Sequence, residues 1–419
     1  MELGMNVFLY APELTGHPQV YCRVIGDILL EAGHKVFIAA ASDQETVWSD
    51  WYDIEPFGGH GNVCFLDTRS FSSKGDDHLS AEELGSLQKK YSIDSTLFIE
   101  GEWFREQFIR IGHGEAPRLH GRNVAICSRA NHWCFGEDAY TGEKKTVFGS
   151  TVRQTCGRVK RALFNRSESD CYFYETILMR KRVVDSLIVK DERIAEKYGS
   201  PVYWMPEIYR VFNDDSAVKQ ATDWDQFSEP IKEYIKTAGA GNVLLYFGTG
   251  TWYKGYDYFL KLAELDESTF ALHAGAPERH EPNKPLFFDT SALRDSLRSQ
   301  RRLFETNAFV ESSELVDLLF NSIERFVSTH RLTLSSGTML QALEAGTPVL
   351  VPGTGLVGWR VKKFGLGKTY NYLDEQDLAR AWKEFREEPV DKYKERIQNY
   401  MKHFSRDAVR SFFLSQLCG

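Results

Sequence analysis

The sequence lacks the features that mark several protein classes. Its seven cysteines are scattered over 419 residues and never form a C-x-x-C pair, which favours reduced thiols over a disulfide framework or a zinc site. Histidines and carboxylates show no metal-ligand spacing, so we expect no bound metal and no cofactor. No apolar run is long enough to cross a bilayer, and no basic segment precedes an apolar one near Met1, so we predict a cytoplasmic protein without a secretion signal.

The chain also lacks an excess of positive charge. Its formal net charge is −8 at pH 7, which argues against a nucleic-acid partner held by bulk electrostatics. The segment 152–182 departs from this balance, because basic residues outnumber acidic ones there and aromatic residues lie between them. We expect Arg158, Lys160 and Arg161 to contact an anionic acceptor at the inner face of a membrane. A solvated helix face is the alternative.

Apolar strands alternate with amphipathic helices along most of the chain, and the length is that of two domains. This pattern predicts α/β architecture with two Rossmann-like, doubly wound parallel-sheet domains. We place the first domain at residues 1–212, a polar linker at 213–240 and the second domain at 241–395. A final amphipathic helix at 396–419 is expected to cross back to the first domain.

A polar, glycine-containing loop precedes a helix in the stretch from Ser335 to Pro352. Small residues at a helix start leave backbone N–H groups free to hold an anion, so Ser336, Gly337 and Thr338 are candidate phosphate ligands. An ordinary N-cap is the alternative for this stretch alone.

The segment from Gly248 to Gly255 reads Gly-Thr-Gly-Thr-Trp-Tyr-Lys-Gly and lies between a predicted strand and a predicted helix. It resembles the G-R-x-x-x-x-K-G segment of glycosyltransferase family 4, a family of GT-B fold, in which the Arg and Lys bind the donor diphosphate. Lys254 and Gly255 match this pattern, whereas Thr249 replaces the arginine. A solvated lysine at a helix start is the alternative for Lys254.

The stretch from Gly337 to Pro348 is similar to the helix G-T-x-x-E-A-x-x-x-G-x-P of GT-B donor sites, part of which families 1 and 4 share. Gln341 stands where those families have a Glu that binds the donor ribose, and an amide can still accept a hydrogen bond from a hydroxyl. Thr333 stands where family 4 has its second Glu. Glu344 is a further donor-binding candidate of the same helix.

The stretch from Pro12 to His34 resembles family 1, in which P-x-x-x-G-H-x-x-P carries a catalytic histidine. His17 matches that base and Gly16 precedes it, although the next proline comes early; an exposed loop histidine is the alternative.

His132 follows another predicted strand and is a second, weaker catalytic candidate. The favoured alternative is a structural histidine packed by Trp133. Glu100 and Glu102 could orient such a histidine, but ordinary surface carboxylates are the commoner interpretation.

The resemblance implies two domains facing a cleft and a glycosyltransferase that moves a hexose-type sugar from a nucleotide-diphosphate sugar to a carbohydrate or lipid-linked acceptor, without a metal. His17 as base would imply inversion at the anomeric carbon. Two alternatives stay open: a nucleotide-sugar epimerase or hydrolase of the same fold, and a degenerate sugar-nucleotide-binding protein, which the departures at Thr249, Thr333 and Gln341 would suit.

Overall fold

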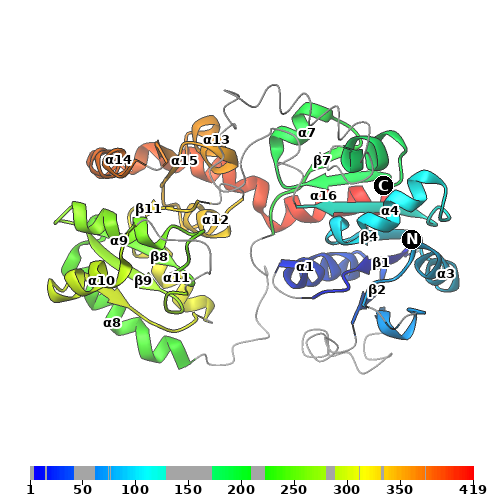
Figure 1. The fold of residues 1–419 in the computed structure, drawn as a ribbon, viewed down its shortest axis with the longest axis horizontal. Coiled ribbons are helices and arrows are strands. Elements are labelled where there is room, and N and C mark those ends of the chain that lie inside the picture. The colour runs from blue at the N-terminus through cyan, green and yellow to red at the C-terminus, as the bar shows by residue number, and fades with distance from the viewer. Residues whose placement is uncertain are drawn as a thin grey trace. The chain divides into compact units, whose positions relative to one another are not determined.

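The structure is a computed structural model that describes residues 4–14, 17–41, 62–73, 75, 77–128, 172–208, 222–279, 288–310, 312–331, 335–372 and 374–419. These residues divide into two compact units. The first contains the described residues up to Ile208 together with Phe404–Gly419, and the second runs from residue 222 to His403 (Figure 1).

The first unit is built on a parallel sheet of seven strands in the order β3-β2-β1-β4-β5-β6-β7. In the middle of the sheet, Val7 of β1 is in register with Val36 of β2 on one side and with Ser95 of β4 on the other. The strand order therefore reverses between β1 and β4, as in doubly wound folds. The strands are β1 (Asn6–Tyr10), β2 (Lys35–Ala40), β3 (Val63–Asp67), β4 (Ser95–Phe98), β5 (Arg122–Cys127), β6 (Ser186–Val189) and β7 (Val202–Trp204).

Side chains of this sheet alternate between two apolar layers. Val7 and Leu9 of β1 belong to a layer with helices α1 and α16, whereas Phe8 and Tyr10 belong to a layer on the opposite face. Both faces are thus buried, which explains why the strands read as almost continuous apolar runs. The helices of this unit are α1 (His17–Glu31), α3 (Ala81–Lys90), α4 (Arg105–His113), α7 (Glu192–Tyr198) and α16 (Arg406–Cys418), with a π-helix at Tyr172–Arg180.

The second unit contains two parallel sheets of three strands, in the orders β10-β9-β8 and β11-β12-β13. Strands β8 and β11 lie next to each other, so the six strands together form the central layer of this unit. The strands are β8 (Val243–Phe247), β9 (Phe270–Ala274), β10 (Leu303–Glu305), β11 (Phe326–Val327), β12 (Val349–Pro352) and β13 (Gly367–Tyr370).

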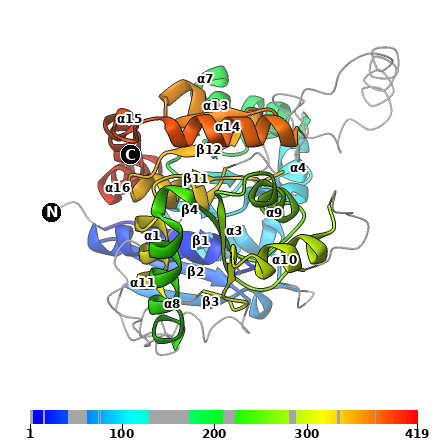
Figure 2. The same ribbon diagram turned by 90° about the vertical axis from the view of Figure 1, so that its left-hand side faces the viewer.

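Helices cover this layer; α13 and α14 lie against β12 and β13 (Figure 2). None of the helices within the described ranges is long and apolar enough to span a membrane. The helices of the second unit are α8 (Thr222–Ala238), α9 (Tyr256–Leu265), α10 (Thr290–Ser299), α11 (Ser313–Asn321), α12 (Gly337–Glu344), α13 (Gly355–Phe364), α14 (Glu375–Glu387) and α15 (Asp391–Met401).

The stretch 213–240, expected to be a polar linker, contains the 17-residue helix α8. Phe227, Ile231 and Ile235 are spaced at four residues and are buried, so the helix has one apolar face despite Pro230 in its interior. The prediction of a linker was wrong for residues 222–238. The apolar residues of this helix recur only every fourth position among many charged residues, so they did not stand out as a helical face.

The expected final helix at 396–419 is two helices. Helix α15 ends at Met401, and Ser405 begins α16 by accepting a hydrogen bond from Ala408 N at 3.3 Å. Only α16 belongs to the first unit, where it contacts α1, β4 and β5. Its red ribbon in Figure 1 lies among the blue and cyan elements of that unit.

We predict that Phe413→Ala destabilises the first unit by about 3–5 kcal/mol, because the side chain of Phe413 is fully buried in the layer that joins α16 to the sheet. Urea unfolding measures the effect. The half-buried neighbour Phe412 is the control; an equal loss for Phe412→Ala would contradict the assignment of the buried face.

Candidate functional site

The loop Gly248–Gly255 follows β8 at the carboxyl end of that strand and leads into α9. It is docked on the segment that follows β9, because Gly248 N donates to Ala274 O at 2.8 Å and Arg279 N donates to Gly250 O at 2.8 Å. Gly248 has a φ of +99°, a conformation that side chains disfavour. The hydrogen bonds to Ala274 and Arg279 therefore fix the conformation of the loop.

Gly255 makes the closest approach of this loop to the rest of the unit. Its φ is +68°, and a Cβ atom there would lie 1.9 Å from the carbonyl oxygen of Thr329. The hydroxyl of Thr329 donates to Lys254 O at 3.1 Å. Only glycine fits this contact, which joins the loop to the segment following β11.

A buried ion pair reinforces the same contact. Arg331 donates to both carboxylate oxygens of Asp257, at 2.8 and 2.7 Å, and the two side chains are 1% and 0% exposed. Arg331 also donates to Trp252 O at 2.5 Å, and its backbone N–H donates to Tyr253 O at 2.8 Å. The bidentate geometry fixes the loop relative to residues 329–331.

Lys254 is the cation of this loop. It is half-buried, and burial lowers the pKa of its ammonium group. Burial, together with the charge of Lys254, lowers the pKa of the neighbouring His330 to about 3, so this histidine is neutral. Across the described residues no carboxylate forms an ion pair with Lys254. A half-buried cation without a counter-ion is the expected arrangement for binding an anion.

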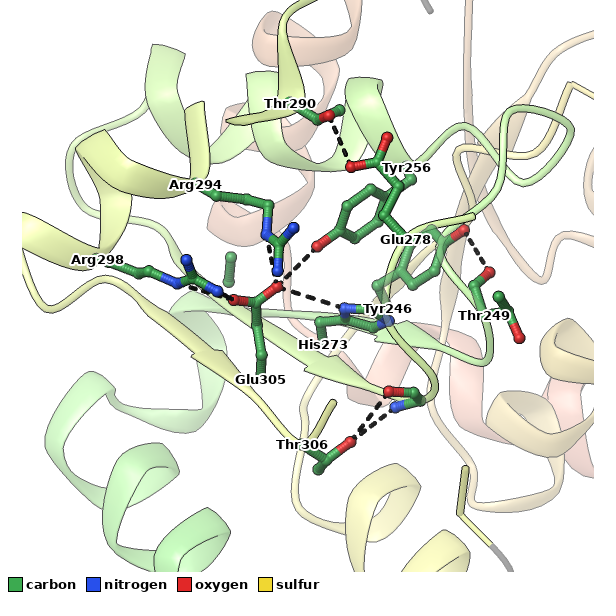
Figure 3. Close-up of polar contacts among 12 residues, drawn as sticks. Tyr246, Thr249, Tyr256, His273, Glu278, Thr290, Arg294, Arg298, Glu305 and Thr306 are labelled. Carbon is green, nitrogen blue, oxygen red and sulfur yellow. Dashed lines mark hydrogen bonds and ion pairs between the residues drawn. The ribbon is translucent and has the colours of Figure 1, made fainter. Parts of the chain in front are cut away.

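A polar network lies behind the loop and is drawn in Figure 3. His273, fully buried on β9, has its Nε2 3.0 Å from Gly248 O. A carbonyl only accepts, so Nε2 carries the proton in this bond. Its Nδ1 lies 3.7 Å from Glu305 Oε1 on β10. The loop backbone is therefore connected through one imidazole to a buried carboxylate.

Glu305 is surrounded by donors (Figure 3). Tyr256 Oη donates to Oε1 at 3.0 Å, Arg294 Nε lies 3.0 Å from the same oxygen, and Arg298 Nε donates to Oε2 at 3.0 Å. Burial opposes ionisation, but the contacts with His273, Arg294, Tyr256 and Arg298 together lower the pKa of Glu305 to about 2. Glu305 is therefore ionised, and Arg294 and Arg298 hold it in place behind the loop.

Helix α12 begins beside the segment that follows β11. Ser336 is its N-cap and accepts from Met339 N at 3.3 Å, while its hydroxyl lies 3.0 Å from that of Thr338. The N–H groups of Gly337 and Thr338, at the first two positions, have no place in the helical ladder. Arg360, fully buried, donates to Ser335 Oγ at 2.9 Å and fixes the approach to the helix.

The comparisons with known proteins concern the fold. No protein-family model matches the sequence, and no curated protein matches it. Among solved structures, Anabaena HepE in complex with UDP aligns with a TM-score of 0.58 at 11% identity over 98% of both chains. A glycosyltransferase from Rickettsia africae gives 0.57 at 10% identity, covering 99% of this chain and 98% of that chain. Sucrose-phosphate synthase from Thermosynechococcus elongatus gives 0.52 at 14% identity over 98% of both.

The fold is GT-B. The expectation of a GT-B fold from three short motifs is thereby confirmed. The subdivision into family 4 or family 1 stays a prediction, since the identities are far too low to carry it.

The GT-B fold puts most of the predicted donor residues at one edge of the second unit. Thr249, Lys254 and Gly255 lie at the carboxyl end of β8, and Ser336, Gly337 and Thr338 follow the adjacent strand β11. Gln341 is half-buried one helical turn from Gly337, on the same face of α12.

Glu344 is not brought to this edge. It is exposed in the last turn of α12, roughly 10 Å further along the helix axis than Gly337. Glu344 therefore lies away from the Gly248–Gly255 loop, with which it was predicted to bind the donor.

Several predicted residues lie outside the described ranges: Gly16, His132, Thr333, Arg158, Lys160 and Arg161. His17 is the first residue of α1, and its side chain is not described. Their roles stay predictions. A metal site was not expected, and within the described residues no group of three or more potential ligands could hold an ion.

Sequence reasoning missed His273, Glu305 and His330. His330 comes three residues after β11, at the edge where ligands gather in parallel sheets, and this position could have identified it. His273 lies inside β9, and Glu305 is the last residue of β10. Each is a polar residue in an otherwise apolar run, and this was the signal that the sequence offered.

We predict that Gly255→Ala lowers the free energy of unfolding of the second unit by about 3 kcal/mol or more. The added Cβ would collide with Thr329 O, in addition to the strain of a positive φ. Gly346→Ala is the matched control: its φ of +77° is similar, but nothing lies within 4 Å of the added atom, so about 1 kcal/mol is expected. Urea unfolding compares the two, and equal losses would contradict the proposed contact.

We predict that Glu305→Gln lowers the free energy of unfolding by about 2–3 kcal/mol near pH 7. The depressed folded pKa means that the carboxylate stabilises the protein above its unfolded pKa, and this contribution disappears as pH falls from about 5 to about 2. The difference in the free energy of unfolding between wild type and Glu305→Gln should therefore become smaller at acidic pH, as urea titrations would measure. The control is Glu229→Gln, at a side chain that is 79% exposed, and it should leave the free energy of unfolding unchanged. If the loss for Glu305→Gln stays the same at every pH, the stabilising role of the ionised carboxylate is contradicted.

Proposed function

We propose that the protein is a glycosyltransferase that takes a sugar from a nucleotide-diphosphate sugar. The observation that carries this proposal is Lys254, a half-buried cation with no ion-pair partner in the described structure, set in a rigid glycine-containing loop at the carboxyl end of β8. Its fold neighbours include Anabaena HepE, solved with UDP and with UDP-glucose. These complexes support a nucleotide sugar as the ligand of the loop.

The chemistry needs neutralisation of the leaving diphosphate. Transfer breaks the bond between the anomeric carbon and the diphosphate, and negative charge develops on the phosphate oxygens. Lys254 would offer one cation to that charge, and the start of α12 would offer backbone donors. The proposed reaction therefore requires no metal ion.

The donor base would lie at the neighbouring strand ends. Phe309 follows β10 and is 68% exposed, which is unusual for a large apolar side chain. Nearby, Thr306 Oγ1 accepts from Gly275 N at 2.9 Å and shapes the chain after β9. We infer that these segments select the nucleobase.

We infer a cytoplasmic enzyme of glycan biosynthesis whose acceptor is a carbohydrate or a lipid-linked sugar. His17, at the start of α1, is the proposed base for an inverting transfer. The basic residues Arg158, Lys160 and Arg161 are the proposed contact with a membrane-bound acceptor. The stereochemistry of the product tests the role of His17, since retention of configuration would exclude a single displacement.

Two other functions use the same donor loop. An epimerase or hydrolase would convert the nucleotide sugar without an acceptor, and a degenerate protein would bind it without turnover. Incubation with UDP-glucose or GDP-mannose alone, followed by NMR of the products, separates them: a new epimer or free sugar favours the first, and tight binding without any product over an acceptor panel favours the second.

We predict that Lys254→Met weakens the binding of UDP or GDP about 10-fold to 100-fold, because a charged hydrogen bond to phosphate contributes about 1.5–3 kcal/mol. Isothermal titration calorimetry measures the affinity, and thermal shift confirms that the variant is folded. The control is Lys236→Met, at a lysine of α8 that is 80% exposed. The donor assignment fails if neither diphosphate binds wild type, or if Lys254→Met binds equally well.

A further inference from the structure

The imidazole of His273 lies between two oxygen acceptors (Figure 3). Its Nε2 is 3.0 Å from Gly248 O, and its Nδ1 faces Glu305 Oε1 at 3.7 Å, which is an ion-pair distance. The side chain is 0% exposed, and within the described residues Nδ1 makes no hydrogen bond. The two ring nitrogens therefore depend on these two oxygens for their electrostatic environment.

Neither neutral tautomer of the imidazole suits this position. With a proton on Nε2 alone, the lone pair of Nδ1 faces the carboxylate of Glu305. With a proton on Nδ1 alone, the lone pair of Nε2 faces the carbonyl oxygen of Gly248. Only the imidazolium ion presents an N–H group to both oxygens, and the ionised Glu305 supplies its counter-charge.

Two arginines share the negative charge of Glu305 with the imidazole, but each has a further acidic neighbour. Asp295 lies 3.7 Å from Arg298. The charge of Glu278 acts on Arg294. Among the described residues of this network, three carboxylates thus face two guanidinium groups. An imidazolium ion brings these charges into balance, and buried charges are stable only when they are paired.

The backbone that His273 holds lies against the ammonium group of Lys254. A Cβ atom added at Gly248 would collide with Lys254 Nζ. The next part of the loop is held from the same side, because Tyr246 Oη donates to Thr249 O and accepts from Thr251 N, both at 3.3 Å. Side chains of β9 and β8 therefore fix the loop backbone from behind.

We propose that His273 is a positioning residue of the donor loop: held as an imidazolium ion between Glu305 and Gly248 O, it fixes the backbone against which Lys254 lies. This inference rests on the proposed function and deepens it, because the affinity for a nucleoside diphosphate then depends on a residue that does not contact the ligand. His273 acts through Gly248, and its charge strengthens the hydrogen bond to that carbonyl.

The first test measures the protonation of His273 in the full chain without nucleotide. Long-range proton–nitrogen NMR at pH 7 on protein labelled with ¹⁵N-histidine distinguishes protonated from unprotonated ring nitrogens. The signals of His273 are those absent from both His273→Phe and His273→Gln. We expect both nitrogens to be protonated in wild type, and Nδ1 to lose its proton in Glu305→Gln, which removes the counter-charge. A neutral His273 in wild type would overturn the proposal.

The second test measures hydrogen–deuterium exchange of the loop 248–255, also without nucleotide. His273→Phe keeps an aromatic ring but donates nothing, so loop exchange should become about 10-fold faster or more. His273→Gln donates one hydrogen bond without a charge and should give an intermediate rate. Exchange as slow as in wild type, in either variant, would overturn the role of the imidazolium ion.

The matched control is Tyr234→Phe, which removes a different side-chain donor to the same strand. Tyr234 Oη donates to Ala271 O of β9 at 2.9 Å, two residues before His273 and further from the loop. Its loss should leave loop exchange unchanged. An equal increase in Tyr234→Phe would show that any damage to β9 loosens the loop, and would overturn the specific role of His273.

Calorimetric titration with UDP and GDP separates this inference from the proposed function. We expect His273→Phe to bind a diphosphate about 10-fold more weakly than wild type and Tyr234→Phe to bind it equally well. Equal binding by His273→Phe would overturn the inference and leave the donor site standing. If neither diphosphate binds wild type while the NMR and exchange results are as expected, the donor site is rejected and the role of His273 in holding the loop is supported.

Discussion

The bidentate pair between Arg331 and Asp257 is the interaction on which the second unit's site depends. It joins the first helix after the β8 loop to the segment after β11, and both side chains are inaccessible to water. Removing one partner of such a pair costs about 3–5 kcal/mol, because the other charge is left buried. Lys254 and Gly255 come just before Asp257 in the chain, and His330 comes just before Arg331. The pair therefore fixes the position of the cation.

The same unit shows how charge is distributed around a backbone loop. His273 connects Gly248 to Glu305, and two arginines hold that carboxylate ionised. Lys254 belongs to the loop itself, and the buried network around Glu305 lies behind the loop.

Much of the architecture could be predicted from sequence, because buried parallel strands leave continuous apolar runs such as Val243–Phe247, and the helices between them have clear apolar faces. The prediction failed at α8, because this helix carries its apolar residues among many charged ones. Site residues close to a glycine loop were recognisable. His273 and Glu305 were not, because only strand order brings them together.

The path of the chain has a consequence for how the protein is made. The first unit takes its core from residues near the start of the sequence and from Val409, Phe413 and Leu417 of α16, with the whole second unit inserted between them. On a ribosome, the second unit emerges complete while the first still exposes the apolar groove that α16 will fill. We therefore expect the first unit to complete its core only after the second unit has been synthesised, and its exposed apolar surface to need a chaperone until then.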